Sequence, residues 1–218
     1  SGDGQPFLSR TEVASDPSTP TPYVLKLKRL DDEPAVLLGR PCYHGLSRDM
    51  ACGPRQWTTH RYSTRVVDSM VTTAAKLSRG RPLVLIGYSG GGTLAMLMAP
   101  QLENVVGVIT VAANLDVAAW TRHHEYSALT GSLNPAQSFD KTYAIPQMHF
   151  FGARDKNIPG SMVARIFNSL PRGSVHIIDD YTHTCCWHKD WASLLRRALE
   201  NMSGVATTSN FAAGDPTP

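Results

Sequence analysis

The sequence of 218 residues contains no apolar run long enough to cross a membrane, so no transmembrane helix is predicted. No cluster of lysines and arginines resembles a groove-reading element, and the net charge of +3 is small. These features do not indicate a nucleic-acid partner. The hydrophobic fraction of 42% is ordinary for a globular protein. The length therefore suits one domain with a sizeable core.

The sequence has no C-x-x-C pair, and its His123-His124-Glu125 run lacks the i, i+4 spacing of a helical metal site. No metal site is therefore predicted. The four cysteines are an even number, which fits two disulfides in an oxidising compartment. A local Cys42–Cys52 bridge is the simplest pairing, and it leaves the adjacent pair Cys185 and Cys186. Cross-pairing between the two loops and four free thiols remain alternatives.

Neither a signal peptide nor an initial methionine is present, which is typical of a processed or trimmed chain. Residues 1–22 are rich in Ser, Thr, Pro, Asp and Gly, and residues 203–218 have a similar composition. We expect the first to be a flexible leader and the second a flexible tail, around a domain spanning 23–202. The paired cysteines and this leader favour a secreted or periplasmic protein, with a lipid anchor or membrane tether at its N-terminus. The sequence predicts no oligomeric state.

Within the domain, predicted strands and helices alternate along the chain. Apolar runs indicate strands at 23–28, 35–38, 83–86, 105–111, 148–151 and 174–178. Helical spacing of apolar residues indicates helices at 63–78, 92–99, 115–120 and 162–167, and a closing helix around 191–199. This alternation predicts an α/β fold with a mostly parallel central sheet and helices on both faces.

One short stretch points to chemistry. Gly87-Tyr88-Ser89-Gly90-Gly91 fits the pattern G-x-S-x-G, with the predicted strand 83–86 before it and a predicted helix after it. A serine on such a sharp strand-to-helix turn presents its hydroxyl at the end of the sheet. The glycines suit a tight turn in which the serine backbone is strained. Ser89 is therefore the predicted nucleophile.

A serine hydroxyl needs a base to take its proton, and the base needs a group to orient it. Asp155 follows the predicted strand 148–151, and His183 follows the strand 174–178. Such groups lie on loops at the carboxyl ends of the strands in an open α/β sheet. We therefore predict Ser89, His183 and Asp155 as nucleophile, base and orienting acid.

Other residues compete for these roles. Asp116 also follows a strand and is the reserve acid, while Asp155 has the alternative role of capping a helix near Pro159. His188 is the rival base, although it is expected to open the last helix. Asp179 and Asp180 lie too close to His183 in the same loop. The remaining histidines are expected to be structural or solvated: His44, His60, His123, His124, His149 and His176.

The elbow around Ser89, the loop Gly152-x-x-Asp155-x-x-Ile158-Pro159 and the late His183 together resemble the α/β-hydrolase superfamily. The resemblance covers nearly the whole domain and is similar in scale to cutinase-like esterases. It implies a reduced α/β-hydrolase fold, because only one helix separates the strands 35–38 and 83–86. The family inserts its cap in the region of 116–145, where about thirty residues leave room for little or no cap.

The resemblance also implies two backbone donors for the oxyanion. One is the N–H of Gly90, directly after the nucleophile. The other is expected in the loop Gly39-Arg40-Pro41-Cys42, where Pro41 has no N–H. Arg40 is the predicted donor and Cys42 the reserve, although Leu38 stands where the family usually has a histidine. A bridge from Cys42 would hold this loop.

The predicted function is hydrolysis of a carboxylic ester through an acyl-enzyme, with no metal or organic cofactor. The expected ligand is a small-molecule or acyl-chain ester, with no nucleic acid. Cleavage of an amide, peptide or thioester by the same residues is an alternative, because the nucleophile does not fix the leaving group. Another is a non-catalytic envelope interaction module on this fold. Candidates for an apolar wall are Trp120, Tyr126, Leu129 and Tyr143.

Overall fold

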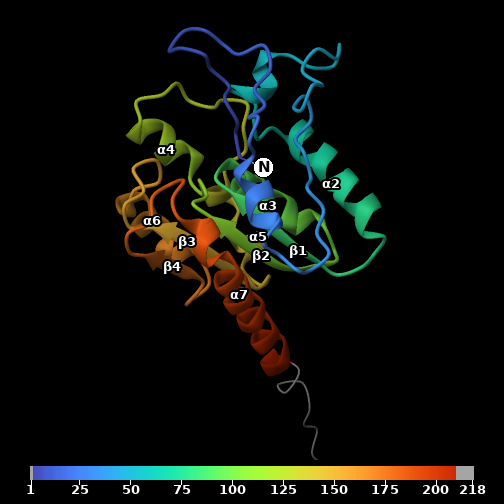
Figure 1. The fold of residues 1–218 in the computed structure, drawn as a ribbon, viewed down its shortest axis with the longest axis vertical. Helices are drawn as coiled ribbons and strands as arrows, with labels where there is room; N and C mark the ends of the chain where they lie inside the picture. The colour runs from blue at the N-terminus through green and yellow to red at the C-terminus, as the bar shows by residue number, and fades with distance from the viewer. Residues whose placement is uncertain (1, 210–218) are drawn as a thin grey trace, which may run out of the picture.

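The computed structural model describes residues 2–209, with backbone alone for 203–209. Its centre is a sheet of four parallel strands in the order β1-β2-β3-β4 (Figure 1). The strands are β1 (Leu83–Tyr88), β2 (Val105–Val111), β3 (Gln147–Gly152) and β4 (Val175–Ile178). The predicted α/β fold with a parallel sheet is confirmed, and all four strands lie where apolar runs indicated them.

Helices cover both faces of this sheet (Figure 1). They are α1 (Tyr23–Lys28), α2 (Thr64–Ser78), α3 (Gly90–Met98), α4 (Val117–His123), α5 (Phe139–Thr142), α6 (Gly160–Ile166) and α7 (Trp187–Ser209). The described residues also include four short 3-10 helices: η1 (Pro54–Trp57), η2 (Ala99–Gln101), η3 (Pro135–Gln137) and η4 (Phe167–Ser169).

The two layers follow from the alternation of side chains along the strands. Ile109 and Phe150 pack against α1 and α7 on one face, in a cluster that includes Trp191. Their neighbours Val108 and Phe151 point to the opposite face and pack against α3 and α6. Successive residues of a strand point to opposite faces, so strands covered on both sides must be apolar throughout.

The predicted strand at 35–38 is wrong. Among residues 2–209, these positions belong to no strand, and Val36 is 71% exposed. A strand exists only where a neighbour accepts and donates its backbone hydrogen bonds. Within the described chain, β1 is an edge strand that pairs with β2 alone, so this apolar run has no strand beside it.

The predicted strand at 23–28 is also wrong, because these residues form α1. Tyr23, Val24 and Leu27 lie on one helical face as well as fitting a strand pattern, and six residues do not distinguish the two periods. Packing decides: Leu27 is 1% exposed in the cluster between the sheet and α7.

Residues 2–22, expected as a flexible leader, make specific contacts instead. The Gln5 N–H donates to the Pro17 carbonyl at 2.8 Å, and the Trp57 indole N–H donates to the Ala14 carbonyl at 3.0 Å. Buried backbone acceptors of this kind tie the segment to the domain. Of the predicted tail 203–218, residues 203–209 continue the backbone of α7, and 210–218 lie outside the described residues.

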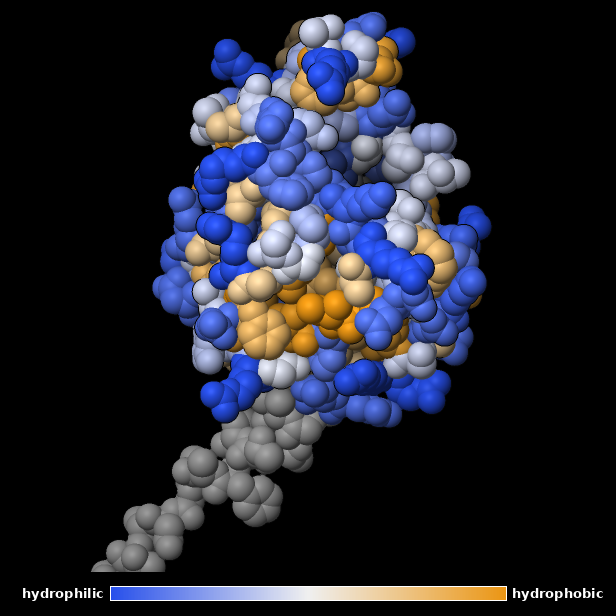
Figure 2. Space-filling view, turned by 90° about the vertical axis from the view of Figure 1, so that its left-hand side faces the viewer, coloured by the Kyte–Doolittle hydropathy of each residue, from blue (hydrophilic) through white to orange (hydrophobic). Residues whose placement is uncertain are grey.

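The surface is largely hydrophilic on the side that carries α6 and β4, with one gathered hydrophobic area (Figure 2). On the edge strand β4, Ile177 is 54% exposed, and Phe167 beyond α6 is 50% exposed. Among the described helices, none is both long enough and apolar enough to span a bilayer.

A histidine is buried in the sheet itself. His149 on β3 is fully buried, with Nδ1 2.8 Å from Thr110 Oγ1 and Nε2 3.0 Å from Gln147 Oε1. The amide oxygen accepts, so Nε2 carries the proton and Nδ1 accepts from the threonine hydroxyl. Burial, and to a smaller degree His176, lower the pKa of His149 to about 3.

This neutral histidine predicts a loss of stability in acid. Between the ordinary pKa of 6.5 and about 3, the unfolded chain binds a proton at His149 that the folded chain does not. The free energy of unfolding therefore falls as the pH falls through this window, by up to about 1.4 kcal/mol per pH unit. Urea unfolding at pH 7 and pH 5 should show a drop that is about 2 kcal/mol smaller in His149→Gln. Equal drops in both proteins would contradict the assignment.

Candidate active site

Ser89 lies on the sharp turn between β1 and α3. Its backbone φ of 51° and ψ of −127° are unusual for a residue other than glycine. The turn leaves no space at its base, because a Cβ atom on Gly87 would clash with the backbone of Gly91. The Ser89 N–H donates to the Val111 carbonyl at 2.9 Å, which joins the turn to the end of β2. The geometry is that of a tight strand-to-helix turn with a strained serine backbone, as the sequence predicted.

The three residues predicted to act together lie together. His183 Nε2 is 3.0 Å from Ser89 Oγ, and His183 Nδ1 is 2.8 Å from Asp155 Oδ2. The Asp155 carboxylate is fully buried, while the His183 side chain is 21% exposed. A carboxylate accepts, so Nδ1 carries a proton and Nε2 offers its lone pair to the serine hydroxyl. This arrangement can remove the proton of Ser89.

Asp155 also organises its own loop. Its second oxygen, Oδ1, accepts from the N–H groups of Asn157 at 2.7 Å and Ile158 at 2.9 Å. The alternative role of helix cap is not what the structure has, because α6 begins at Gly160 with no side-chain cap. The turn ahead of α6 instead holds the carboxylate in one orientation toward the imidazole.

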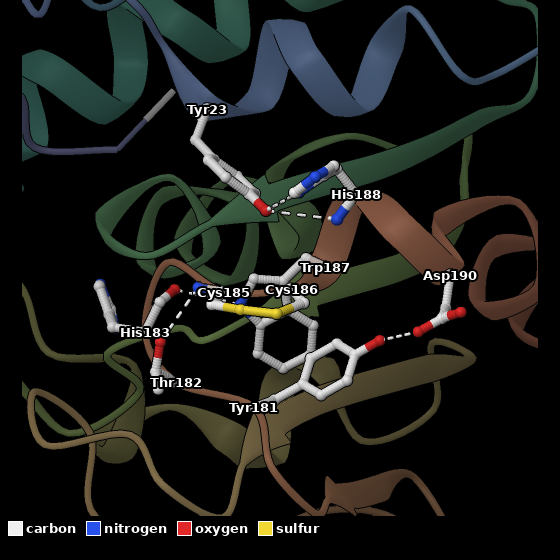
Figure 3. Close-up of a disulfide and its surroundings, with 9 residues drawn as sticks. All are labelled: Tyr23, Tyr181, Thr182, His183, Cys185, Cys186, Trp187, His188 and Asp190. Carbon is white, nitrogen blue, oxygen red and sulfur yellow. Dashed lines mark hydrogen bonds between the residues drawn. A yellow bond between two sulfur atoms is a disulfide. The ribbon is translucent and has the colours of Figure 1, made fainter.

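The competing residues are engaged elsewhere. Asp116 caps α4 by accepting from the Ala119 N–H at 3.0 Å, and it also accepts from Asn134 at 2.9 Å. His188 directs Nδ1 to the Tyr23 hydroxyl at 3.1 Å. In Figure 3 the ring of His183 is turned away from His188 and its tyrosine partner.

The loop of His183 is held at several points. The backbone carbonyl of His183 accepts from the Tyr88 hydroxyl at 2.9 Å and from the Trp187 indole N–H at 3.1 Å. The two cysteines that follow are bonded to each other, beside Thr182, whose N–H donates to the Cys185 carbonyl at 2.8 Å (Figure 3). The second pair is Cys42–Cys52, so both bridges are local and cross-pairing does not occur.

The wall candidates separate in space. Trp120 donates its indole N–H to Asn157 Oδ1 at 3.2 Å, so it lies against the loop of Asp155. Tyr126 packs against Trp120 with ring centroids 5.2 Å apart and is 57% exposed. Tyr143 lines a hollow with residues 171–174 at the start of β3, which is the end of the strands opposite to Ser89. Leu129 packs against the cluster around α2.

Residues 2 and 3 lie against Ser89 and Gly90, which the sequence did not predict. A Cβ atom on Gly2 would be 3.7 Å from Ser89 Cβ. Gly90 has no room for a Cβ atom, because the Asp3 carboxylate and the Tyr62 hydroxyl occupy that space. The start of the described chain thus forms part of the site.

The Asp3 carboxylate is held by two buried cations. Its Oδ1 is 2.6 Å from Arg40 Nη2, its Oδ2 is 3.3 Å from Arg61 Nη1, and the Tyr62 hydroxyl donates to Oδ2 at 2.6 Å. The Arg40 side chain is 1% exposed. Burial alone raises the pKa of Asp3, but Arg40, then Arg61, and the Tyr62 hydroxyl outweigh it and lower that pKa to about 2.

For Arg40 the structure gives a side-chain role, the ion pair with Asp3. Its guanidinium also lies over the rings of Tyr43 and Tyr62, 5.6 and 5.3 Å from their centroids. The strand that was expected to lead its backbone N–H to the site is not present among residues 2–209. Its predicted role as an oxyanion donor therefore stays a prediction.

Comparisons with solved structures identify the fold. Puromycin hydrolase, as an S511A mutant complexed with PGG, aligns with a TM-score of 0.59 at 17% identity over 81% of this chain and 30% of that chain. The α/β hydrolase MGS-MChE2, from the metagenome of sediments of the lagoon of Mar Chica in Morocco, aligns with a TM-score of 0.50 at 15% identity, over 68% and 76%. The esterase domain of a Rhodothermus marinus protein is 23% identical over 57% of this chain and 62% of that domain, with a TM-score of 0.46.

Protein-family profiles and curated protein sequences gave no match. The chain spans less than two thirds of that esterase domain and about a third of puromycin hydrolase. At these identities the likeness bears on architecture alone, and it shows an α/β-hydrolase fold with a four-stranded parallel sheet. This conclusion rests on the alignments with puromycin hydrolase and MGS-MChE2, and the predicted fold is confirmed.

The Asp3 ion pairs predict a second acid sensitivity, in a lower window. Because the folded-state pKa of Asp3 is about 2 and its ordinary value is 3.8, the carboxylate stabilises the fold above pH 3.8. That stabilisation, on the order of 2 kcal/mol, is lost as the pH falls through about 2. Asp3→Asn should therefore be less stable at pH 7, and the difference should narrow between pH 4 and pH 2. Urea unfolding across this range measures it, and a constant difference would contradict the ion-pair account.

Proposed function

We propose that the protein is a serine hydrolase that cleaves a carboxylic ester through an acyl-enzyme. The observation that carries this proposal is the hydrogen-bonded series from Ser89 to His183 to Asp155, at 3.0 and 2.8 Å. The half-buried position of Ser89 at the carboxyl end of β1 supports it, because a substrate has access to the hydroxyl.

The chemistry follows from the proton positions. His183 Nε2 takes the proton of Ser89 as Oγ attacks the ester carbonyl carbon, and the buried Asp155 carboxylate stabilises the imidazolium. The imidazolium then gives that proton to the leaving oxygen, so that an alcohol departs and an acyl-serine remains. Water, deprotonated by the same nitrogen, attacks the acyl-serine and releases the acid.

The oxyanion of each intermediate needs two preorganised donors. Gly90 is one, because it begins α3 and its N–H has no acceptor within the helix. For the second we favour the N–H of Asp3 over the earlier expectation of Arg40. The support is the contact of Gly2 with Ser89 and the packing of the Asp3 carboxylate on Gly90. In this arrangement Arg40 acts through its ion pair with Asp3.

Labelling by a fluorophosphonate tests the nucleophile. Wild-type protein should be labelled at Ser89, and Ser89→Ala should lose the label entirely, because Ser89 carries the hydroxyl that is hydrogen-bonded to His183 Nε2. His183→Ala should slow labelling by at least about a thousandfold. Matched controls are Ser193→Ala on the exposed face of α7 and His188→Ala, both of which should label like wild type. An unlabelled wild-type protein would refute the proposal.

The same adduct distinguishes the two candidates for the second donor. In a crystal structure of the phosphonylated protein, the phosphonyl oxygen should lie about 3 Å from the N–H groups of Gly90 and Asp3. Contact with the N–H of Arg40 instead would restore the earlier assignment.

Two alternatives remain open to the same assays. A panel of esters, thioesters and amides with one acyl group separates an esterase from a thioesterase or an amidase or peptidase. A non-catalytic interaction module would neither label nor turn over any of them. The hydrogen bond between His183 and Ser89 favours the catalytic reading.

We further propose that the protein works in an oxidising compartment, as a secreted or periplasmic domain. The support is that all four cysteines are paired. Alkylation of protein isolated from cells without a reductant should modify none of them, and four modified cysteines would overturn this location.

A further inference from the structure

Asn157 contacts more of the site than any other residue of its loop. Its N–H donates to the acid Asp155 at 2.7 Å, and its carbonyl is 2.9 Å from His124 Nε2. Its side chain spans from Trp120 to the base, with Oδ1 3.2 Å from the indole nitrogen and Nδ2 3.2 Å from His183 Nε2. Backbone and side chain are therefore both fixed.

The orientation of the Asn157 amide follows from its partners. The indole N–H of Trp120 is a donor only, so the amide oxygen must face it. The NH2 group then faces His183 Nε2, which is an acceptor because Nδ1 carries the proton given to Asp155. Each side of the amide thus has the partner that its chemistry requires.

One lone pair therefore has two donors. His183 Nε2 lies 3.0 Å from Ser89 Oγ and 3.2 Å from Asn157 Nδ2. During acyl transfer, the leaving atom must come within about 3 Å of Nε2 to receive its proton. In the free protein, the amide nitrogen of Asn157 occupies a position of that kind next to the base.

We propose that Asn157 is a specificity-determining residue on the leaving-group side of Ser89, and that it selects an oxygen leaving group. This inference rests on the proposed function. The amide N–H of Asn157 donates to the ester oxygen as that oxygen replaces it beside Nε2. Asn157 gives no such bond to a thioester sulfur, because sulfur is a weak acceptor. When the substrate is an amide, its N–H and the N–H of Asn157 are both donors and face each other unfavourably.

The segment that follows β2 takes part through Trp120. Without the indole N–H, the Asn157 amide is oriented only by the lone pair of His183 Nε2 that it shares with Ser89, and it can more readily turn its oxygen toward the leaving group. Trp120 is thus a positioning residue, which acts through Asn157 and prepares the donor before the substrate arrives.

Paired substrates test the proposal. An alkyl ester and the thioester with the same acyl and alkyl groups are compared by kcat/KM in wild type and Asn157→Ala. The ester rate should fall about tenfold, as expected for one hydrogen bond lost in the transition state, and the thioester rate should change little. The ester-to-thioester ratio therefore falls about tenfold, and Trp120→Phe should lower it in the same direction.

A merely structural role would slow both substrates alike and leave the ratio unchanged, which would overturn the inference. Lys156→Ala is the matched control, since Lys156 is an exposed neighbour in the same loop, and its ratio should equal that of wild type. Absence of phosphonate labelling in the wild type would refute the proposed function and this inference together. Labelling with an unchanged ratio in Asn157→Ala would refute this inference alone.

The resting contact has a readout that needs no turnover. In Ser89→Ala, the competing hydroxyl is gone, and among residues 2–209 Asn157 is the remaining donor with a hydrogen bond to His183 Nε2. The 15N resonance of this nitrogen should move toward that of an acceptor without a donor when Asn157→Ala is added. An unmoved resonance would show that the amide does not donate there, and would overturn the proposal.

Discussion

The hydrogen bond between His183 and Asp155 decides the chemistry of every group around it. At 2.8 Å from a fully buried carboxylate, Nδ1 must carry the proton, and the lone pair of the imidazole is thereby on Nε2. From that assignment it follows that Ser89 Oγ donates to Nε2, and that Nε2 can also accept from the NH2 group of Asn157, which the Trp120 indole turns toward it. Reversal of the tautomer would leave the serine without a base.

The positions of Ser89, Asp155 and His183 were predictable because each has a strand directly before it. The carboxyl ends of parallel strands meet at one edge of the sheet, so a position after β1, β3 or β4 translates into a position in space. Chain order and strand identification were sufficient to predict that Ser89, Asp155 and His183 lie together. The same reasoning failed for the run 35–38, because an apolar pattern reports burial tendency and does not supply the neighbour that a strand needs.

The contribution of residues 2–22 was not predictable from composition. A segment rich in small and polar residues resembles a flexible leader, and its retention depends on a charge partner far away in the sequence. The sequence around the partner of Asp3 did contain an indication. Arg40 follows an apolar run, and a guanidinium that is buried needs an anion. Asp3 satisfies that need, and Gly2 and the carboxylate of Asp3 then reach Ser89 and Gly90.

The aromatic residues after β2 illustrate a further limit of sequence patterns. Trp120 was predicted to form part of an apolar wall, yet its indole N–H makes the more specific contact. This N–H fixes which side of the Asn157 amide faces His183. A hydropathy value describes the whole side chain and does not report the indole N–H as a hydrogen-bond donor. Because the indole N–H of Trp120 can only donate, it fixes the orientation of the Asn157 amide, and that amide in turn contacts the imidazole of His183. Trp120 on α4 therefore affects His183 without a contact between the two being required. Specificity at Ser89 then depends on a hydrogen bond made one residue further out.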